Sequence, residues 1–385
     1  MKYIDLGIVP NKNRQKTRKK KIIKFGIVTL LLGVVLYSGY LFYWPLSRLI
    51  NEIIHHPGSV LSFIQNPSGE LESEDGRTNV LLLGIDKRAN VAYSYKDSQG
   101  VVHQNGFLTD TIIVLSVGRE TKDAAMISIP RDTWVDIPSW DKFPAGAGKI
   151  NSVYSIGNTQ YYQGGGLQLI KDVVSKKLGI TIHYGVRVDF EGFKKSIDTL
   201  DGVDVKVDRA FDDYQYPVEG KEQATCSGGS FSCRYEHLHF DSGLQKMDGK
   251  KALQFVRSRT GTNGEGSDFA RATRQQKILI AARNKALSLE NLLDPAKVNN
   301  LFRDFGESIE TDFSIILYPS AYKLLKEINA DSTRKLVLSP QESGLLYTPN
   351  PAQYGGAYVL LPKGGGWEAV QKKVSGLLFI DSSKK

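Results

Sequence analysis

NVLLLGID, residues 79–86, is a continuous aliphatic run that ends in an aspartate. Short apolar runs that stop at glycine, proline or acidic residues are typical of buried strands. Two similar runs follow, DTIIVLSV at 110–117 and AAMISIP at 124–130. We therefore expect these three segments to be buried strands of a sheet.

Outward from these strands, further strand patterns alternate with helical ones. The segment GLQLIKDVVSKKLG, 166–179, has apolar residues at helical spacing and ends in glycine. This mixture predicts an α/β sandwich in which helices cover a sheet, within one domain over 77–381. The other expected strands are 184–190, 203–207, RKLVLS and AYVLLP, and the other expected helices are EGFKKSIDTLDG, 247–259, 268–290, 314–328 and WEAVQKKVSGLL.

Positive charge is concentrated at the N-terminus. The 385 residues carry a formal net charge of +9, and nine Lys or Arg against Asp5 within residues 1–24 account for nearly all of it. The remaining sequence is close to neutral, so it does not have the charge of a nucleic-acid-binding domain. We expect a basic cytoplasmic tail over 1–24 and no nucleic-acid partner.

Residues 25–44, FGIVTLLLGVVLYSGYLFYW, contain no charged side chain. Twenty helical residues span about 30 Å, the thickness of the hydrocarbon core of a bilayer. Basic residues before this segment and aromatic residues at its far end predict a single-pass anchor in the cell membrane, with the N-terminus in the cytoplasm. A cleavable signal peptide is the alternative, but the apolar segment is long and the bulky YLFYWPL stands where small residues are needed.

Residues 45–76 follow the anchor and contain several prolines and glycines, so we expect a stalk there. Beyond it the domain lies outside the cytoplasm, where Cys226 and Cys233 in CSGGSFSC are expected to form a local disulfide. A zinc site with His237 and His239 is the alternative. Four ligands at familiar spacings are not visible, which disfavours it.

Two aspartates stand at strand ends. Asp86 closes NVLLLGID and Asp110 opens DTIIVLSV. Carboxylates brought close together repel each other unless a cation joins them, and a hard divalent ion with oxygen ligands suits such a pair. The alternative is that each aspartate caps a turn. Arg131 and Asp132 in SIPRDTWVDIP likewise follow an apolar strand, which places another charged pair at a strand end.

The segment ALQFVRSRTGTNGEGSDFARATRQQK, 252–277, is dense in arginine. If Ser267 caps a helix, Asp268, Arg271 and Gln275 share one face of it. Guanidinium groups clustered there and at the end of the preceding helix could bind phosphate oxygens bidentately. A solvated helix surface is the competing interpretation. The candidate residues on both helices are Arg257, Arg259, Asp268, Arg271, Arg274 and Gln275.

Several common hydrolase and nucleotide motifs are absent. The sequence contains no G-x-S-x-G, no H-E-x-x-H and no G-x-x-x-x-G-K-[ST]. Serine hydrolases, zinc proteases and P-loop NTPases of the familiar kinds therefore have no support.

These motifs together resemble the LytR-CpsA-Psr (LCP) family of membrane-anchored cell-wall enzymes. The resemblance follows the family's order over about 200 residues, beside the same arrangement of tail, anchor and outer domain. The motifs are LLLGID, TDTIIVLSV, SIPRDTWV, KINSVYSIG, VDFEGFKKSIDTLDGVDV, DGKKALQFVRSR and DFARATRQQK.

The resemblance implies a mixed central sheet with helices on both faces, and a phosphotransferase that moves a glycopolymer from a polyprenyl-pyrophosphate carrier onto a wall acceptor such as peptidoglycan. It implies that Asp86 and Asp110 hold Mg²⁺ or Mn²⁺, and that the prenyl chain lies in an apolar tunnel. A carboxylate near the acceptor, Asp132 or Asp268, is the candidate general base. The implied pyrophosphate ligands are Arg131, Arg257, Arg259, Arg271, Gln275 and, from the same helix, Arg274.

Two features depart from the family pattern. Leu108 occupies a position where many members have arginine, and CSGGSFSC is an insertion to which the resemblance assigns no role. Two further functions stay open on sequence grounds. One is a pyrophosphatase that hydrolyses the same lipid-linked substrate, and the other is a non-catalytic regulator that binds polyprenyl phosphate or glycopolymer.

Overall fold

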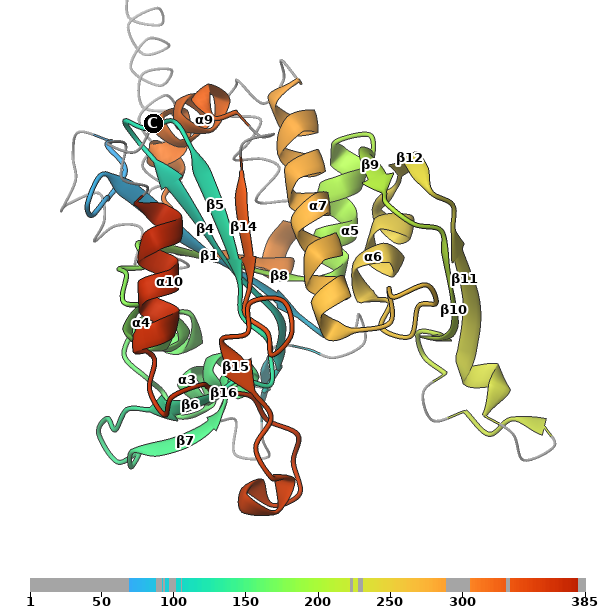
Figure 1. Cartoon of the computed structure of the whole chain (residues 1–385), viewed down its shortest axis with the longest axis horizontal. Coiled ribbons are helices and arrows are strands. Elements are labelled where there is room, and N and C mark those ends of the chain that lie inside the picture. Colours follow the sequence, from blue (N-terminus) through green and yellow to red (C-terminus); the bar gives the residue numbers. More distant parts are fainter. Residues whose placement is uncertain are drawn as a thin grey trace, which may run out of the picture. The chain divides into compact units, whose positions relative to one another are not determined.

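In the computed structural model, six strands form a mixed central sheet in the order β13, β8, β1, β4, β5 and β14 (Figure 1). Strand β1 pairs antiparallel with β4 and parallel with β8, and β4 pairs antiparallel with β5. The three aliphatic runs of the sequence are therefore adjacent strands. The bounds are β13 (Ile309–Thr311), β8 (Tyr184–Asp189), β1 (Arg77–Ile85), β4 (Thr109–Gly118), β5 (Ala124–Ser128) and β14 (Arg334–Val337).

The structure describes residues 69–87, 92, 94–96, 102–104, 106–221, 224–227, 231–288, 305–329 and 333–379. They belong to one compact unit, Ser62–Lys385. The tail 1–24, the membrane helix 25–44 and most of the stalk 45–76 expected from the sequence lie outside the described residues. No helix in the described part is long and apolar enough to cross a membrane.

One face of the sheet is covered by three helices, α3 (Val153–Thr159), α4 (Gly165–Leu178) and α10 (Glu368–Leu378). Their apolar residues pack against alternate strand residues, which include Leu81, Leu83 and Ile112, to form the main hydrophobic core. We call this side of the sheet the filled face.

The opposite face is covered by α9 (Tyr318–Glu327) at one end and by α7 (Asp268–Leu287) farther along. Figure 1 shows α7 standing beside β14, on the side of the sheet away from α4 and α10. Near β5, the side chain of Gln276 donates to the hydroxyl of Ser128 over 2.8 Å. We call this side the cavity face.

A second hydrophobic core lies beyond α7. It is built by α5 (Phe190–Thr199), α6 (Gly249–Arg257), α7 and two antiparallel strand pairs, with Val205, Phe211, Phe240 and Phe255 among its buried residues. The two pairs are β9 (Val203–Val207) with β12 (Gly243–Met247), and β10 (Phe211–Pro217) with β11 (Tyr235–Phe240).

Three short strand pairs complete the described fold. Each is antiparallel and lies outside the six-stranded sheet. The pairs are β2 (Ser94–Lys96) with β3 (Val102–Gln104), β6 (Trp134–Ile137) with β7 (Gly146–Lys149), and β15 (Leu346–Tyr347) with β16 (Leu361–Pro362).

Most of the expected elements are present, with two corrections. The strand expected at 203–207 forms, but it pairs with β12 in the second core and does not enter the main sheet. Only Leu361–Pro362 of the expected strand AYVLLP is a strand. The residue before them, Leu360, instead forms an isolated bridge to Thr133, because its backbone bonds to the segment beside Arg131.

Side-chain caps explain where the helices of the second core begin. The Ser267 hydroxyl accepts a hydrogen bond from the Ala270 amide over 3.0 Å, so α7 starts where the sequence predicts. Asp248 caps α6 in the same way through the Lys251 amide. In the turn between α6 and α7, a Cβ on Gly266 would lie 2.5 Å from the carbonyl oxygen of Gly261, so the tight return of the chain requires glycine there.

Candidate active site

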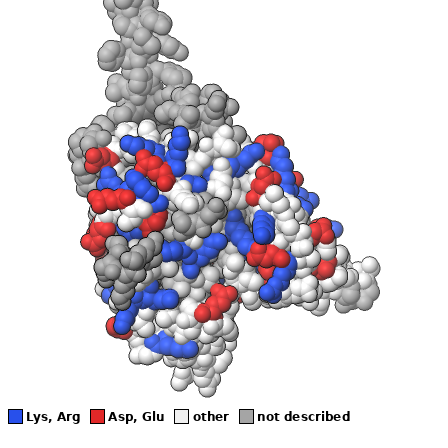
Figure 2. Space-filling view, turned by 45° about the horizontal axis from the view of Figure 1, so that its top comes forward, with Lys and Arg blue, Asp and Glu red and all other residues white. Residues whose placement is uncertain are grey.

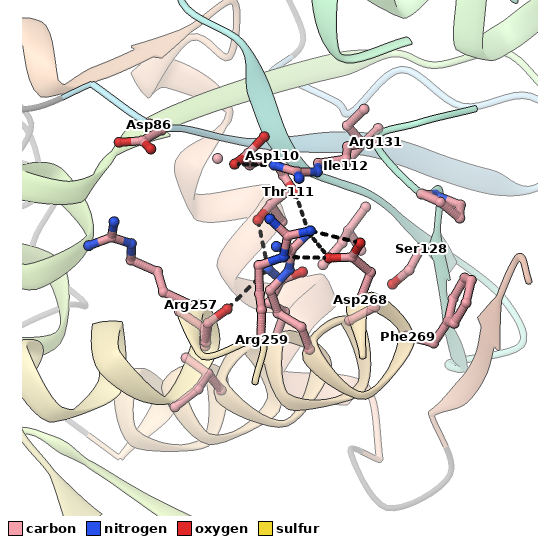
Figure 3. A pocket seen from close by; sticks show the side chains of 18 of the residues that line it. Asp86, Asp110, Thr111, Ile112, Ser128, Arg131, Arg257, Arg259, Asp268 and Phe269 are labelled. Atoms are coloured by element: carbon pink, nitrogen blue, oxygen red, sulfur yellow. Dashed lines mark hydrogen bonds and ion pairs between the residues drawn. The ribbon is translucent and has the colours of Figure 1, made fainter. Parts of the chain in front are cut away.

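A cavity of about 810 Å³ lies between the cavity face of the sheet and helices α5, α6 and α7. Most of its wall is apolar, and its charged residues gather at the sheet edge where β1 ends and β4 begins (Figure 3). The apolar lining includes Leu82, Ile113, Val186, Val188, Phe193, Leu253, Ile278, Leu279 and Val337.

The residue alternation of β1 separates the cavity from the main core. Leu81 and Leu83 point into the filled face and are buried, whereas Leu82 and Gly84 line the cavity and are only half-buried. Adjacent side chains of a strand point to opposite faces of a sheet. A single aliphatic run therefore builds a packed core on one side and a ligand-sized space on the other.

Asp86 and Asp110 lie at the same end of two neighbouring central strands, β1 and β4. Because β1 and β4 are antiparallel, with Ile85 opposite Thr109, the end of one strand adjoins the start of the other. Both carboxylates line the cavity, and Figure 3 shows them above Arg257 and Arg259.

Arg131 forms an ion pair with Asp110, with 2.9 Å between Nη1 and Oδ2. Its Nε is buried, lies 3.5 Å from Oδ2 of Asp132, and has no hydrogen-bond partner among the described residues. Burial opposes the charge of Arg131, but Asp110, Asp268 and Asp132 outweigh burial and raise its pKa. Arg131 thus stays charged beside the two carboxylates of Asp110 and Asp132.

Asp132, a candidate base, is held by Lys149. The Lys149 ammonium lies 2.6 Å from Oδ1 of Asp132, while Arg131 approaches the other carboxylate oxygen. Lys149 belongs to KINSVYSIG, for which the sequence predicted no individual role. Lys149 and Arg131 therefore fix the orientation of the Asp132 carboxylate.

Asp268, the other candidate base, joins two arginines. Arg259 binds it bidentately at 2.9 and 3.1 Å, and Arg271 binds Oδ1 at 3.0 Å (Figure 3). Burial opposes the charge of Asp268, but Arg271, Arg259 and Arg131 outweigh it and lower its pKa. A carboxylate with a lowered pKa is a weak base at neutral pH. The geometry therefore favours a positioning role, in which Asp268 orients the two arginines.

Arg271 is charged despite its burial. Burial lowers its pKa to about 10, with partial compensation from Asp268. Because this value is still well above neutral pH, the guanidinium keeps its proton. It also donates to the backbone oxygen of Asp110, which ties α7 to the start of β4.

Arg257 differs from the other arginines of the cavity. Its guanidinium stacks over the ring of Phe190 at 4.1 Å and donates to the Tyr216 hydroxyl over 3.2 Å. No carboxylate of the described residues forms an ion pair with it. Figure 3 shows its side chain apart from the pair of Arg259 and Asp268 and on the side of Asp86. Its positive charge therefore remains available to an anionic ligand.

Gln275 lines the cavity one helical turn beyond Arg271. Its amide donates to the Thr111 hydroxyl over 2.8 Å, which fixes α7 against β4. A Cβ on Gly84 would lie 2.9 Å from Cβ of Thr111. The absence of a side chain at Gly84 therefore leaves room for Thr111 and its hydrogen bond with Gln275.

Arg274 corrects one expectation, because it is a structural residue and not a cavity ligand. It is 2% exposed and does not line the cavity. Its guanidinium donates to backbone oxygens at the end of α6 and in the following turn, and to the Glu265 carboxylate. Each step along a helix rotates the side chain by about 100°, so Arg274 turns away while Arg271 and Gln275 face the cavity.

The cavity also contains residues that sequence reasoning missed. Phe190 and Tyr216 support Arg257, and Tyr358 contributes an exposed ring from the C-terminal segment. Leu360 bonds through its backbone to Asp132 and to Trp134, which fixes that segment beside Arg131. Phe190 belongs to the motif VDFEGFKKSIDTLDGVDV, but the resemblance assigned it no role, and Tyr216 lies in a strand that the sequence analysis did not predict.

The cysteines of the insertion and the histidines that follow it do not line the cavity. Cys226 and Cys233 form a disulfide, and His237 and His239 lie on β11. Within the described ranges, no group of three or more His, Cys, Asp or Glu side chains is placed to hold a metal ion. Leu108, the departure from the family pattern, is exposed and outside the cavity lining.

Charge on the surface is mixed. On the face in Figure 2, basic and acidic side chains are interspersed and no continuous basic area is visible. This agrees with the nearly neutral sequence beyond residue 24.

Comparison with known proteins decides the family. The LytR_cpsA_psr family profile matches residues 59–347. The chain belongs to the LytR-CpsA-Psr family. Residues 348–379, which include Tyr358 and Leu360, continue beyond the matched region.

Relatives within the family align with most of this chain. A "polyisoprenyl-teichoic acid--peptidoglycan teichoic acid transferase TagU" of Oceanobacillus iheyensis is 30% identical over 311 residues, which cover 79% of this chain and 80% of the relative. A protein of the same name from Enterococcus faecalis is 26% identical over 326 residues, covering 83% and 89%.

Solved structures of LytR-CpsA-Psr proteins share the fold. Bacillus subtilis TagV matches with a TM-score of 0.53 and 24% identity, covering 80% of this chain and 98% of TagV. A structure described as TagT bound to LIIa-WTA matches with a TM-score of 0.52 and 23% identity, covering 80% and 95%. The mixed α/β fold implied by the sequence resemblance is therefore confirmed.

Proposed function

We propose that this protein transfers a glycopolymer from a polyprenyl-pyrophosphate carrier onto a cell-wall acceptor such as peptidoglycan. The observation that carries the proposal is a largely apolar cavity whose charged end contains the side chains of Arg131, Arg257, Arg259 and Arg271. A ligand that matches both parts has a hydrocarbon chain joined to a multiply charged anion. Relatives named as polyisoprenyl-teichoic acid transferases support such a substrate.

The apolar part of the cavity would hold the prenyl chain. Its floor is the cavity face of the sheet and its roof is α5, α6 and α7, so the chain would lie between two packed layers. Burial of apolar surface contributes roughly 25 cal/mol per Å². The prenyl chain would thus supply binding energy, and the charged end would position the reacting phosphate.

The arginines would bind the pyrophosphate. In phosphoryl transfer, the acceptor oxygen forms a bond to the polymer-linked phosphorus while the bond from that phosphorus to the oxygen of the lipid phosphate breaks. Negative charge grows on the leaving phosphate, where fixed guanidinium groups stabilise it. Arg257, without a carboxylate partner among the described residues, is the strongest candidate, and Arg131, Arg259 and Arg271 line the same cavity.

The cavity lining also fits a divalent cation that arrives with substrate. Six aspartates against four arginines line the cavity, so an anionic ligand needs more positive charge than the protein supplies. Mg²⁺ commonly uses one or two carboxylates together with substrate phosphates. Asp86 and Asp110 would hold Mg²⁺ or Mn²⁺, which would neutralise charge on the phosphate oxygens when bound.

The acceptor proton would be removed by Asp132. Asp132 has only one close basic contact, Lys149, and a longer one to Arg131, whereas Asp268 is bound by two arginines at both oxygens. Lys149 would also keep the Asp132 carboxylate oriented toward the cavity. In this arrangement Asp268 fixes Arg259 and Arg271, and Asp132 acts on the acceptor hydroxyl.

A transfer assay tests the function. Purified full-length protein is incubated with polyprenyl-pyrophosphate-linked polymer and wall fragments, and wall-linked polymer is expected to accumulate with release of polyprenyl phosphate. Free polymer without wall-linked product would instead identify a pyrophosphatase. Saturable lipid binding without either product would identify a non-catalytic regulator.

We further propose that residues 25–44 anchor the protein in the cell membrane, with 1–24 in the cytoplasm and the domain outside. The uncharged segment and its basic flank support this orientation. Protease added to intact spheroplasts is expected to remove the domain and spare an epitope tag at the N-terminus. Protection of the domain would contradict the proposal.

A further inference from the structure

The β10–β11 hairpin projects from the second core, and we call residues 211–241 the arm. It contains β10, β11 and the disulfide between Cys226 and Cys233. In Figure 1 the hairpin runs along the side of the domain opposite α4 and α10. The disulfide lies in the connection between the two strands.

The inner face of the arm is fixed to the core. The ring of Phe211 stacks on Phe240 at 5.0 Å, and Phe240 contacts the ring of Phe255 on α6 at 5.2 Å. All three rings are buried. The strands of the arm are therefore held in one position relative to the cavity.

The outer face of the arm is aromatic and exposed. Tyr214 is 63% exposed, and its ring lies nearly parallel to that of His237, with 4.4 Å between centroids. Tyr235, which is 44% exposed, lies two residues before His237 on β11 and therefore on the same side of the strand. Exposed rings fixed in place are a common feature of binding surfaces, because little side-chain entropy is lost on contact.

A carboxylate fixes the imidazoles of this surface. Oδ1 of Asp212 lies 2.7 Å from Nε2 of His237 and 2.8 Å from Nδ1 of His239, and Asp241 approaches the other nitrogen of His239. His237 in turn covers one face of Tyr214. The second face of the Tyr214 ring is thereby presented to solvent in a fixed orientation.

The arm adjoins the candidate active site. Asp213, Gln215, Tyr216 and Pro217, on the same strand as Tyr214, line the cavity. Tyr216 also contacts Arg257 through its hydroxyl. A polymer that lay along the outer face of the arm would therefore end close to the charged end of the cavity.

The arm is acidic. Residues 211–241 contain six acidic and two basic side chains, whereas the sequence beyond residue 24 as a whole is close to neutral. Like charges repel a phosphate-rich polymer, whereas carboxylates accept hydrogen bonds from sugar hydroxyls. An uncharged polysaccharide backbone can pack against the exposed rings and donate hydrogen bonds to the carboxylates.

We propose that the outer face of the arm binds the glycan strand of the acceptor, with a pyranose ring lying on the open face of Tyr214. The negative face of an aromatic ring attracts the weakly positive C–H groups of a sugar ring, and flat apolar contact adds to this attraction. The proposal rests on the proposed function, which makes a wall glycan the acceptor.

The test measures binding of the full chain to sacculi stripped of phosphate polymers. Tyr214→Ala is expected to weaken binding by roughly two- to tenfold, the value of one aromatic contact. Tyr214→Phe keeps the ring and is expected to bind like the unchanged protein. Leu244→Ala, at a site 74% exposed on β12 outside the arm, is the matched control and should have no effect.

Unchanged sacculus binding by Tyr214→Ala, or no binding by the unchanged protein, would overturn the proposal. Stronger binding to a soluble polyol-phosphate polymer than to stripped sacculi would also overturn it, because the arm would then hold the donor. Polyprenyl pyrophosphate is measured separately and should bind equally to all variants. A failure of that measurement alone would count against the proposed function, while a Tyr214-dependent sacculus signal would still support the arm.

Discussion

The filled face and the cavity face of the central sheet use the same strands in opposite ways. On the filled face, Leu81 and Leu83 pack against α4 and α10 and are almost fully buried. On the cavity face, Leu82 and Gly84 border a space of about 810 Å³. Both sets come from the run NVLLLGID, so hydrophobicity alone does not distinguish a core residue from a ligand-lining one.

The difference shows that the helices covering a sheet face determine whether that face is packed into a core or borders a cavity. On the filled face, apolar side chains of the helices interdigitate with the strands. On the cavity face, α7 approaches the sheet through the polar side chains of Gln275 and Gln276, which bond to Thr111 and Ser128. These contacts hold the helix at the sheet while leaving space between them for a ligand.

The largest expected effect is a difference in the free energy of unfolding between a variant of the filled face and a variant of the cavity face. Leu83→Ala should lower the free energy of unfolding by about 2–5 kcal/mol, because it leaves a void in a packed core. Leu82→Ala, one residue away, should cost less than Leu83→Ala, because its side chain already borders empty space and its removal creates less new void. Denaturant unfolding of the two variants measures both values, and equal losses would contradict the distinction between the faces.

Arg257→Ala should affect activity and not folding. It removes a guanidinium group that has no carboxylate partner in the described part of the chain, so transfer should fall by roughly 100- to 1000-fold. The measurement is turnover of lipid-linked polymer, together with a thermal melt. Retention of full turnover would exclude Arg257 from the pyrophosphate site.

Arg274→Ala is the matched control on the neighbouring helix. Its guanidinium bonds to backbone oxygens at the end of α6 and to Glu265, so its loss should lower stability by leaving buried acceptors unsatisfied. Activity per folded molecule should fall less than in Arg257→Ala. The opposite pattern would restore Arg274 as a ligand residue.

Filling the cavity should affect lipid binding with little loss of stability. Ala272→Phe, on α7 and in the cavity lining, adds a ring to the space expected to hold the prenyl chain. Affinity for polyprenyl pyrophosphate should fall about tenfold or more, since a buried ring displaces part of the chain. Binding of inorganic pyrophosphate is the control and should change little.

The smallest effect concerns pH. The pKa of Asp268 is lowered, because the attraction of Arg271, Arg259 and Arg131 exceeds the opposing effect of burial. Its charge therefore stabilises the fold above the unfolded pKa of about 3.9, and this contribution is lost as pH falls through the lower folded pKa. Asp268→Asn should be destabilised at pH 7, with the difference from the unchanged protein shrinking below about pH 4.

Melting temperatures of both proteins between pH 7 and pH 2.5 measure this dependence. A difference that stayed constant across the range would show that the ion pairs of Asp268 contribute nothing to stability. Asp212→Asn, on the outer face of the arm, provides a comparison outside the cavity lining. It tests whether acid sensitivity belongs to the arginine cluster or to carboxylates in general.

Local signals in the sequence were sufficient for much of the fold and part of the site. The three aliphatic runs predicted β1, β4 and β5, and Ser267 predicted the start of α7 because a capping hydroxyl acts within three residues. The strand-end positions of Asp86 and Asp110 predicted a shared edge. Arg274 could not be placed, because a helix of unknown rotation does not reveal which face meets a cavity.

The sequence by itself determined the elements, the strand-end charges and the family, because these depend on residue periodicity, caps and the order of motifs. Only the tertiary structure decided which alternate residues of β1 face the cavity, which arginines reach it, and that Phe190, Tyr216 and Tyr358 complete its wall. The physical reason is that strand pairing and helix rotation bring distant segments together. Side chains 100 or more residues apart, such as Asp110 and Arg271, then share one site.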